Sequence, residues 1–157
     1  MAPGTMIIGA DHAGYLLKED IKVFLIEKGM MVVDVGTVNC DAVDYPDYGS
    51  LAAQRVSSGE FDQGVLICGS GIGMSIVANK FPNIRAALCL DEDMAQMSRL
   101  HNDSNILVLA ARKTDTAKAR AICDIWLKTE FEGGRHKKRI DKIKDLEQKL
   151  LQMKKSS

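Results

Sequence analysis

The sequence predicts a doubly wound α/β fold built on a five-stranded parallel sheet, and two observations carry this prediction. Short apolar runs rich in Val, Ile and Leu alternate with longer segments whose apolar residues recur at helical spacing. The short runs are nearly continuous in their hydrophobicity, as expected of parallel strands covered by helices on both faces. Strand–helix–strand units of this kind form right-handed crossovers, so successive strands run parallel.

The elements follow one another in a regular order. The expected strands lie at residues 5–11, 30–36, 63–69, 84–90 and 105–111. The expected helices lie at residues 15–29, from a turn around Pro46 to about Ser57, and at 73–80, 92–101 and 114–131. This alternation is that of a Rossmann-like sheet.

The composition changes after Gly134, which divides the chain into an α/β domain (residues 1–134) and a C-terminal helical arm (residues 135–157). The arm is heavily charged, with one narrow apolar stripe: Ile140, Ile143, Leu146, Leu150 and Met153. Such a stripe is too narrow to bury the helix in its own domain. We therefore expect the arm to pack against a partner chain.

Length and charge limit the class of protein. A chain of 157 residues with 46% hydrophobic residues fits one globular domain. Lys plus Arg and Asp plus Glu both number 21, which gives no reason to expect nucleic acid or a membrane as partner. No apolar run approaches the roughly 20 residues of a membrane span, and the N-terminal segment lacks the basic region of a secretory signal.

The cysteines indicate a reducing compartment. Cys40, Cys68, Cys89 and Cys123 are widely spaced and form no CxxC pair, which argues against a cysteine zinc site or a disulfide framework. We expect free thiols, a cytoplasmic location, and no metal or other cofactor.

Ligands of open α/β sheets bind outside the carboxyl ends of the strands, which directs attention to Cys68. Cys68 ends the third strand and precedes a helix, where the helix dipole and nearby amides favour the thiolate. The loop that follows has almost no side-chain cover (Gly69, Ser70, Gly71, Gly73), so its N–H groups can converge on one oxygen. A thiol beside an anion cradle suits proton abstraction next to a carbonyl. The alternative is a cysteine that merely packs inside a strand.

The glycine loop has a second interpretation as a dinucleotide site. Its pattern is G-S-G-I-G after the third strand, not G-x-G-x-x-G after the first. Asp91 does end the next strand, where a ribose-binding acid would lie. We expect, however, no second domain to hold a hydride acceptor.

Two His-containing pairs are further candidates. Asp11 and His12 follow the first strand and could contact an anion or protonate a ring oxygen, or they could be an ordinary turn. His101 and Asn102 close a helix, where Asn is also a common C-cap residue.

Arg135 and Arg139 are four residues apart at the start of the arm, which places both guanidinium groups on one helix face. Two such groups fit a phosphomonoester. A solvated basic helix or a nucleic-acid patch is the alternative.

Taken together, six segments resemble one family: GADHAG, DYPDYG, CGSGIGMSIVANK, IRAAL, SRLHNDSNILVLAAR and EGGRHKKRI. They resemble type B ribose-5-phosphate isomerases and the related galactose-6-phosphate isomerase subunits, in the same order and from about residue 6 to 143. The resemblance implies a cofactor-free interconversion of ribose 5-phosphate and ribulose 5-phosphate, in the pentose phosphate pathway, through an enediolate. It also implies a homodimer, or a dimer of dimers, whose sites form between two subunits.

The same resemblance assigns roles to the candidate residues. It makes Cys68 the base that moves the proton between C1 and C2. It places Gly69, Ser70, Gly71, Gly73 and Asn102 around the oxyanion. It gives His101 and Asp11 a part in ring opening, with Tyr45 lining the site. It assigns the phosphate to His12, Arg112, Arg135 and Arg139. One branch of the family has a glutamate base just beyond the glycines, where this chain has Met74, so the chain resembles the cysteine branch.

Two other functions stay open on the sequence. The substrate could be a six-carbon aldose phosphate such as allose or galactose 6-phosphate. The chain could also be a non-catalytic phosphate-binding module with a basic tail, although a pure binder has no use for a base such as Cys68 beside two His-containing pairs.

Overall fold

The computed structural model describes residues 4–157 and has the predicted five-stranded parallel sheet. The strand order is β2-β1-β3-β5-β4. The strands are β1 (Thr5–Ala10), β2 (Met31–Asp34), β3 (Gln63–Cys68), β4 (Ala86–Leu88) and β5 (Ile106–Ala110). The chain moves to one side of β1 to form β2 and then to the other side to form β3. The strand order therefore switches direction between β1 and β3, which is where doubly wound sheets bind ligands.

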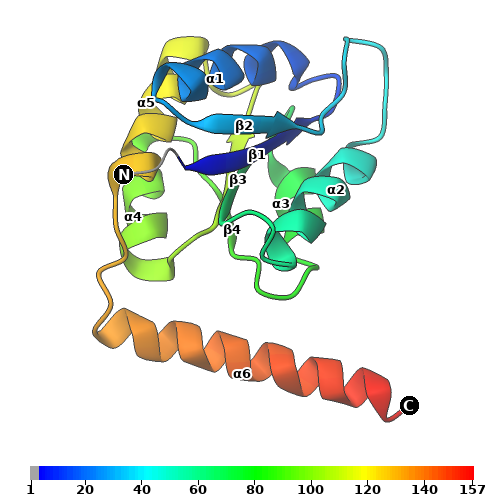
Figure 1. Cartoon of the computed structure of the whole chain (residues 1–157), viewed down its shortest axis with the longest axis vertical. Coiled ribbons are helices and arrows are strands. Elements are labelled where there is room, and N and C mark those ends of the chain that lie inside the picture. Colours follow the sequence, from blue (N-terminus) through cyan, green and yellow to red (C-terminus); the bar gives the residue numbers. More distant parts are fainter. Residues whose placement is uncertain (1–3) are drawn as a thin grey trace.

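Helices cover both faces of the sheet (Figure 1). They are α1 (Tyr15–Glu27), α2 (Tyr45–Ser57), α3 (Ile72–Ala78), α4 (Glu92–Asn102), α5 (Thr116–Lys128) and α6 (Arg135–Lys155). On one face, residues of α1, α4 and α5 form a core that includes the fully buried Trp126. On the other face, α2 and α3 pack their small and apolar residues against the sheet. This two-sided burial explains the continuous apolar strands.

The element boundaries differ from the sequence expectations mainly in the two outermost strands of the sheet. The edge strands β2 and β4 are shorter than the apolar runs that predicted them, because each has only one hydrogen-bonded neighbour. Helix α3 begins at Ile72, one residue earlier than expected, and ends at Ala78. Pro46 lies within the first turn of α2 and not in a turn before it. A proline is tolerated there because first-turn N–H groups have no partner within the helix.

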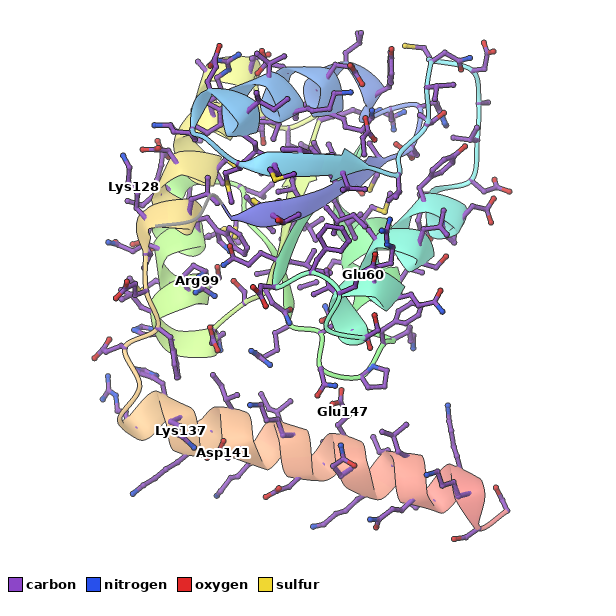
Figure 2. The ribbon with its side chains drawn as sticks, viewed as in Figure 1. Glu60, Arg99, Lys128, Lys137, Asp141 and Glu147 are labelled. Atoms are coloured by element: carbon purple, nitrogen blue, oxygen red, sulfur yellow. The ribbon has the colours of Figure 1, made fainter. Side chains whose placement is uncertain are left out.

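Helix α6 leaves the domain and runs alongside its lower end (Figure 1). Its first turns are anchored by buried His136 and Ile140. Farther along, the Glu147 carboxylate points toward the domain (Figure 2) and accepts a hydrogen bond from the Asn83 N–H at 2.9 Å. Most of the predicted apolar stripe stays about half exposed or more in the single chain: Ile143, Leu146, Leu150 and Met153. Within residues 4–157, none of the helices has the length and hydrophobicity to cross a membrane.

Candidate active site

A cavity of about 220 Å³ opens at the carboxyl edge of the sheet, at the switch between β1 and β3. It is lined by residues from the ends of β1 and β3, the starts of α2 and α3, and the loop after β5: Asp11, His12, Ala13, Tyr45, Cys68, Gly69, Ser70, Gly73 and Arg112. All but Ala13 are residues that the sequence singled out. Their convergence follows from topology, because parallel strands end at one edge.

Cys68 is the last residue of β3 and is only 4% exposed, yet it lines this cavity. It is paired with Ala110 of the neighbouring strand β5, so its backbone is held by the centre of the sheet. Two other cysteines differ from it in their surroundings. Burial raises the pKa of Cys89 to about 11 and that of Cys123 to about 12, since an apolar interior disfavours the thiolate. These two thiols are packing groups, whereas Cys68 faces open space.

The glycines after Cys68 allow two side chains to close over the loop. A Cβ on Gly69 would lie 2.9 Å from Arg112 Nη1, and one on Gly73 would lie 2.5 Å from Tyr45 Cζ. Any larger residue would push the guanidinium or the phenol ring away. Gly71 is constrained differently, because its φ is +76° and a Cβ there would clash with Leu88 Cδ1. Gly71 therefore packs closely against the sheet and does not line the cavity.

The turn after β1 fixes the orientation of Asp11 and His12. The Asp11 carboxylate is buried and accepts a hydrogen bond from the Gly14 N–H at 3.1 Å. The His12 ring accepts one at Nδ1 from the Val43 N–H, also at 3.1 Å. Because Nδ1 is the acceptor, a neutral His12 carries its proton on Nε2. His12 can thus donate to an anion without being charged.

The other predicted residues, His101, Asn102, Arg135 and Arg139, lie at the opposite edge of the sheet; we call them the amino-edge cluster. The Asn102 carbonyl accepts a hydrogen bond from Arg85 Nε at 2.9 Å, just before β4 begins. Cys68 lies at the far end of the sheet, roughly 15 Å away at about 3.3 Å per strand residue. The structure does not bring this cluster into the cavity of the same chain.

Two residues that the sequence interpretation missed join the amino-edge cluster. The rings of His101 and His136 stack, with centroids 4.2 Å apart and planes 13° apart. Glu132 lies beside them, its Oε2 4.0 Å from His136 Nε2. The pKa of His136 lies below its ordinary value because burial disfavours the charged ring, and His101 and Arg135 add positive charge nearby. The four-residue spacing of Glu132 and His136 was the one signal in the sequence that could have identified this pair.

A family model and a known relative both match most of the chain. The family model described as Ribose/Galactose Isomerase matches residues 6–143. Ribose-5-phosphate isomerase B of Escherichia coli is 46% identical over 141 residues, which are 90% of this chain and 95% of that protein.

Solved structures agree with this match. Ribose-5-phosphate isomerase B of Clostridium thermocellum superposes with a TM-score of 0.91 at 51% identity, covering 93% of this chain and 99% of that one. The Mycoplasma genitalium enzyme, solved with bound ribulose-5-phosphate, gives a TM-score of 0.90 at 39% identity and covers 94% and 99% of the two chains. With the fold, the cavity and these matches in agreement, the chain belongs to the ribose/galactose isomerase family.

Proposed function

We propose that this isomerase interconverts ribose 5-phosphate and ribulose 5-phosphate, with Cys68 as the base. The observation that carries the proposal is the composition of the carboxyl-edge cavity. One thiol, one Nε2–H donor (His12) and one guanidinium (Arg112) line the same small space. The named substrates of the E. coli and M. genitalium relatives fit such a combination of a base and anion-binding groups.

The proposed chemistry needs one proton to move between two neighbouring carbons. After the sugar ring opens, the Cys68 thiolate takes the proton from C2 of the aldose. The C2–H electron pair forms the C1=C2 double bond, and O1 takes the negative charge of an enediolate. Return of the proton to C1, with transfer of the O2 proton to O1, completes the ketose. N–H groups around Gly69, Ser70 and Gly73 stabilise the oxyanion, because no Cβ blocks their approach.

The rest of the proposed site belongs to a second copy of the chain. This partner chain supplies an amino-edge cluster to each cavity: His101 for ring opening, Asn102 for the oxyanion, and Arg135 and Arg139 for the phosphate. The distance between cavity and cluster within one chain supports this arrangement. The exposed apolar stripe of α6 supports it as well, since a homodimer would cover that stripe. The four free cysteines support a reducing, cytoplasmic setting.

A coupled assay of ribose 5-phosphate conversion in the presence of a chelator tests the function. We expect full activity in wild type and in the control Cys40→Ala, whose thiol is exposed. Cys68→Ala should fold normally and lose about 10²- to 10⁴-fold in kcat, the usual contribution of a positioned base. Wild-type turnover in Cys68→Ala would refute the role of the thiol.

The same assay separates the two substrate classes. Because the matching family model includes galactose isomerases, six-carbon aldose 6-phosphates are the second candidate. A higher kcat/KM for allose or galactose 6-phosphate than for ribose 5-phosphate would favour that class.

A further inference from the structure

The side chains of His101, Glu132 and His136 form a cluster in which the isomerisation chemistry uses only His101 and leaves the other two unexplained. One ligand atom from each residue can be chosen so that all three lie within 4.8 Å of one another. The cluster joins the end of α4 to the start of α6. The Glu132 N–H donates to the Leu100 carbonyl at 3.1 Å, which holds the Glu132 backbone beside the end of α4.

We infer that His101, Glu132 and His136 form a binding site for a divalent cation of the Zn²⁺ type, and that its occupancy inhibits the isomerase. Two imidazoles and one carboxylate are a ligand set that binds zinc and leaves a fourth position for water. The inhibitory part of this inference rests on the proposed function, whereas the binding part does not.

Binding one ion requires only a small movement of the three ligand atoms. Zinc–ligand bonds of about 2.1 Å place tetrahedral ligand atoms about 3.4 Å apart, so the present separations must close by at most about 1.4 Å. His136 is buried and is fixed by packing, but Glu132 is exposed and His101 is partly so. Rotation of these two side chains, which also opens the ring stack, is enough to converge on one ion.

The charges around the site explain why occupancy would inhibit. Arg135 Nε donates to His136 Nε2 at 3.5 Å, so a cation must displace this guanidinium to reach the nitrogen. Arg139, one turn farther along α6, also opposes a cation. Displacing Arg135 would remove a proposed phosphate ligand, and binding His101 would withdraw it from the partner's cavity. Metal and phosphosugar therefore compete for the same residues, and the cation acts as an inhibitor and not as a cofactor.

Cobalt spectroscopy on the full chain tests the site without using activity. Co²⁺ should bind once per chain and give the visible d–d bands of a low-coordinate site, with no sulfur-to-cobalt charge-transfer band. Glu132→Gln should weaken binding at least about tenfold, since even groups that only orient a ligand contribute that much. His136→Ala should abolish it. The matched control is Glu130→Gln, which removes the same charge from an exposed residue two positions away and should bind like wild type.

Each result decides the inference. Equal Co²⁺ binding in wild type, Glu132→Gln and His136→Ala would overturn the site, and so would a thiolate band or no binding at millimolar cobalt. For the second part, Zn²⁺ should raise the apparent KM of wild type and Glu130→Gln reversibly, with recovery on addition of chelator, and should leave Glu132→Gln much less affected. Metal binding without this inhibition would overturn the regulatory part. If the metal-free protein lacks isomerase activity, the proposed function fails, but the cobalt spectra still decide the site.

Discussion

Replacing Gly69 by alanine places a methyl group against the Arg112 guanidinium. The added Cβ would lie 2.9 Å from Nη1, 3.0 Å from Cζ and 3.2 Å from Nε of that side chain. These distances are too short for carbon contacts, so the guanidinium must move. Because it is the free end of a flexible side chain and Gly69 does not have positive φ, the fold should tolerate the change. The perturbation is thus directed at one cavity-lining group.

The size of the effect follows from what Arg112 is proposed to do. A hydrogen bond between a charged donor and a phosphate contributes about 1.5–3 kcal/mol. Losing it should lower kcat/KM by roughly 10- to 150-fold, at about 1.4 kcal/mol for each factor of ten. Arg112 is assigned to the phosphate and not to the reacting carbons, so most of the loss should appear in KM.

Steady-state kinetics of Gly69→Ala, Arg112→Ala and the double variant measure this effect as a cycle. If Gly69→Ala acts through Arg112, it should lower kcat/KM only slightly in the Arg112→Ala background. Thermal unfolding should show that both single variants stay folded. An unchanged KM in Gly69→Ala, or the same fold loss in both backgrounds, would refute the reasoning.

Three further predictions concern other groups. Arg135→Ala should raise KM for phosphorylated sugars with little change in kcat; an unchanged KM in steady-state assays would remove it from the phosphate site. At pH 8, iodoacetamide should label the exposed Cys40 and also Cys68, and ribose 5-phosphate should protect Cys68 alone. Cys89 and Cys123 should stay unlabelled, because burial raises their pKa values and keeps them as thiols. Mass spectrometry of the peptides measures this, and labelling of Cys68 that the substrate does not reduce would contradict the assignment. Burial opposes ionisation of Asp34, but hydrogen bonds from two lysines outweigh it and lower its pKa. The stability that the ionised Asp34 contributes is therefore fully present above the unfolded pKa of about 3.9 and is lost as pH falls through the lower folded value. In denaturant titrations at decreasing pH, the free energy of unfolding should fall less steeply in Asp34→Asn than in wild type. Equal pH slopes in the two proteins would contradict this.

Much of the fold could be predicted because local sequence and burial agree. Residues 64–68 of the third expected strand are all apolar or glycine, and the structure buries all five between two helical layers. The strand order could not be predicted, since nothing in the local sequence says that Cys68 lies beside Ala110 and not beside β4. That pairing depends on which long-range packing is lowest in free energy.

Part of the candidate site could likewise be predicted from the sequence, and part could not. Asp11 and Cys68 directly follow or end strands, so topology alone carries them to one edge. His101 ends a helix, and topology carries it to the other edge. Gly71 packs against Leu88 because its backbone is left-handed, and the pattern of glycines in the loop does not reveal this. The stacking of His136 on His101 depends on the docking of α6, which the sequence does not specify.

Mixing two inactive variants tests the shared site most directly. Cys68→Ala lacks the base but has an intact amino-edge cluster, whereas His101→Ala is the reverse. Unfolding and refolding them together at equal concentrations should give half heterodimers, each with one intact site of two, and restore about a quarter of wild-type turnover. Restoration at that level is the predicted result. A mixture as inactive as its two components would contradict a site built from two chains.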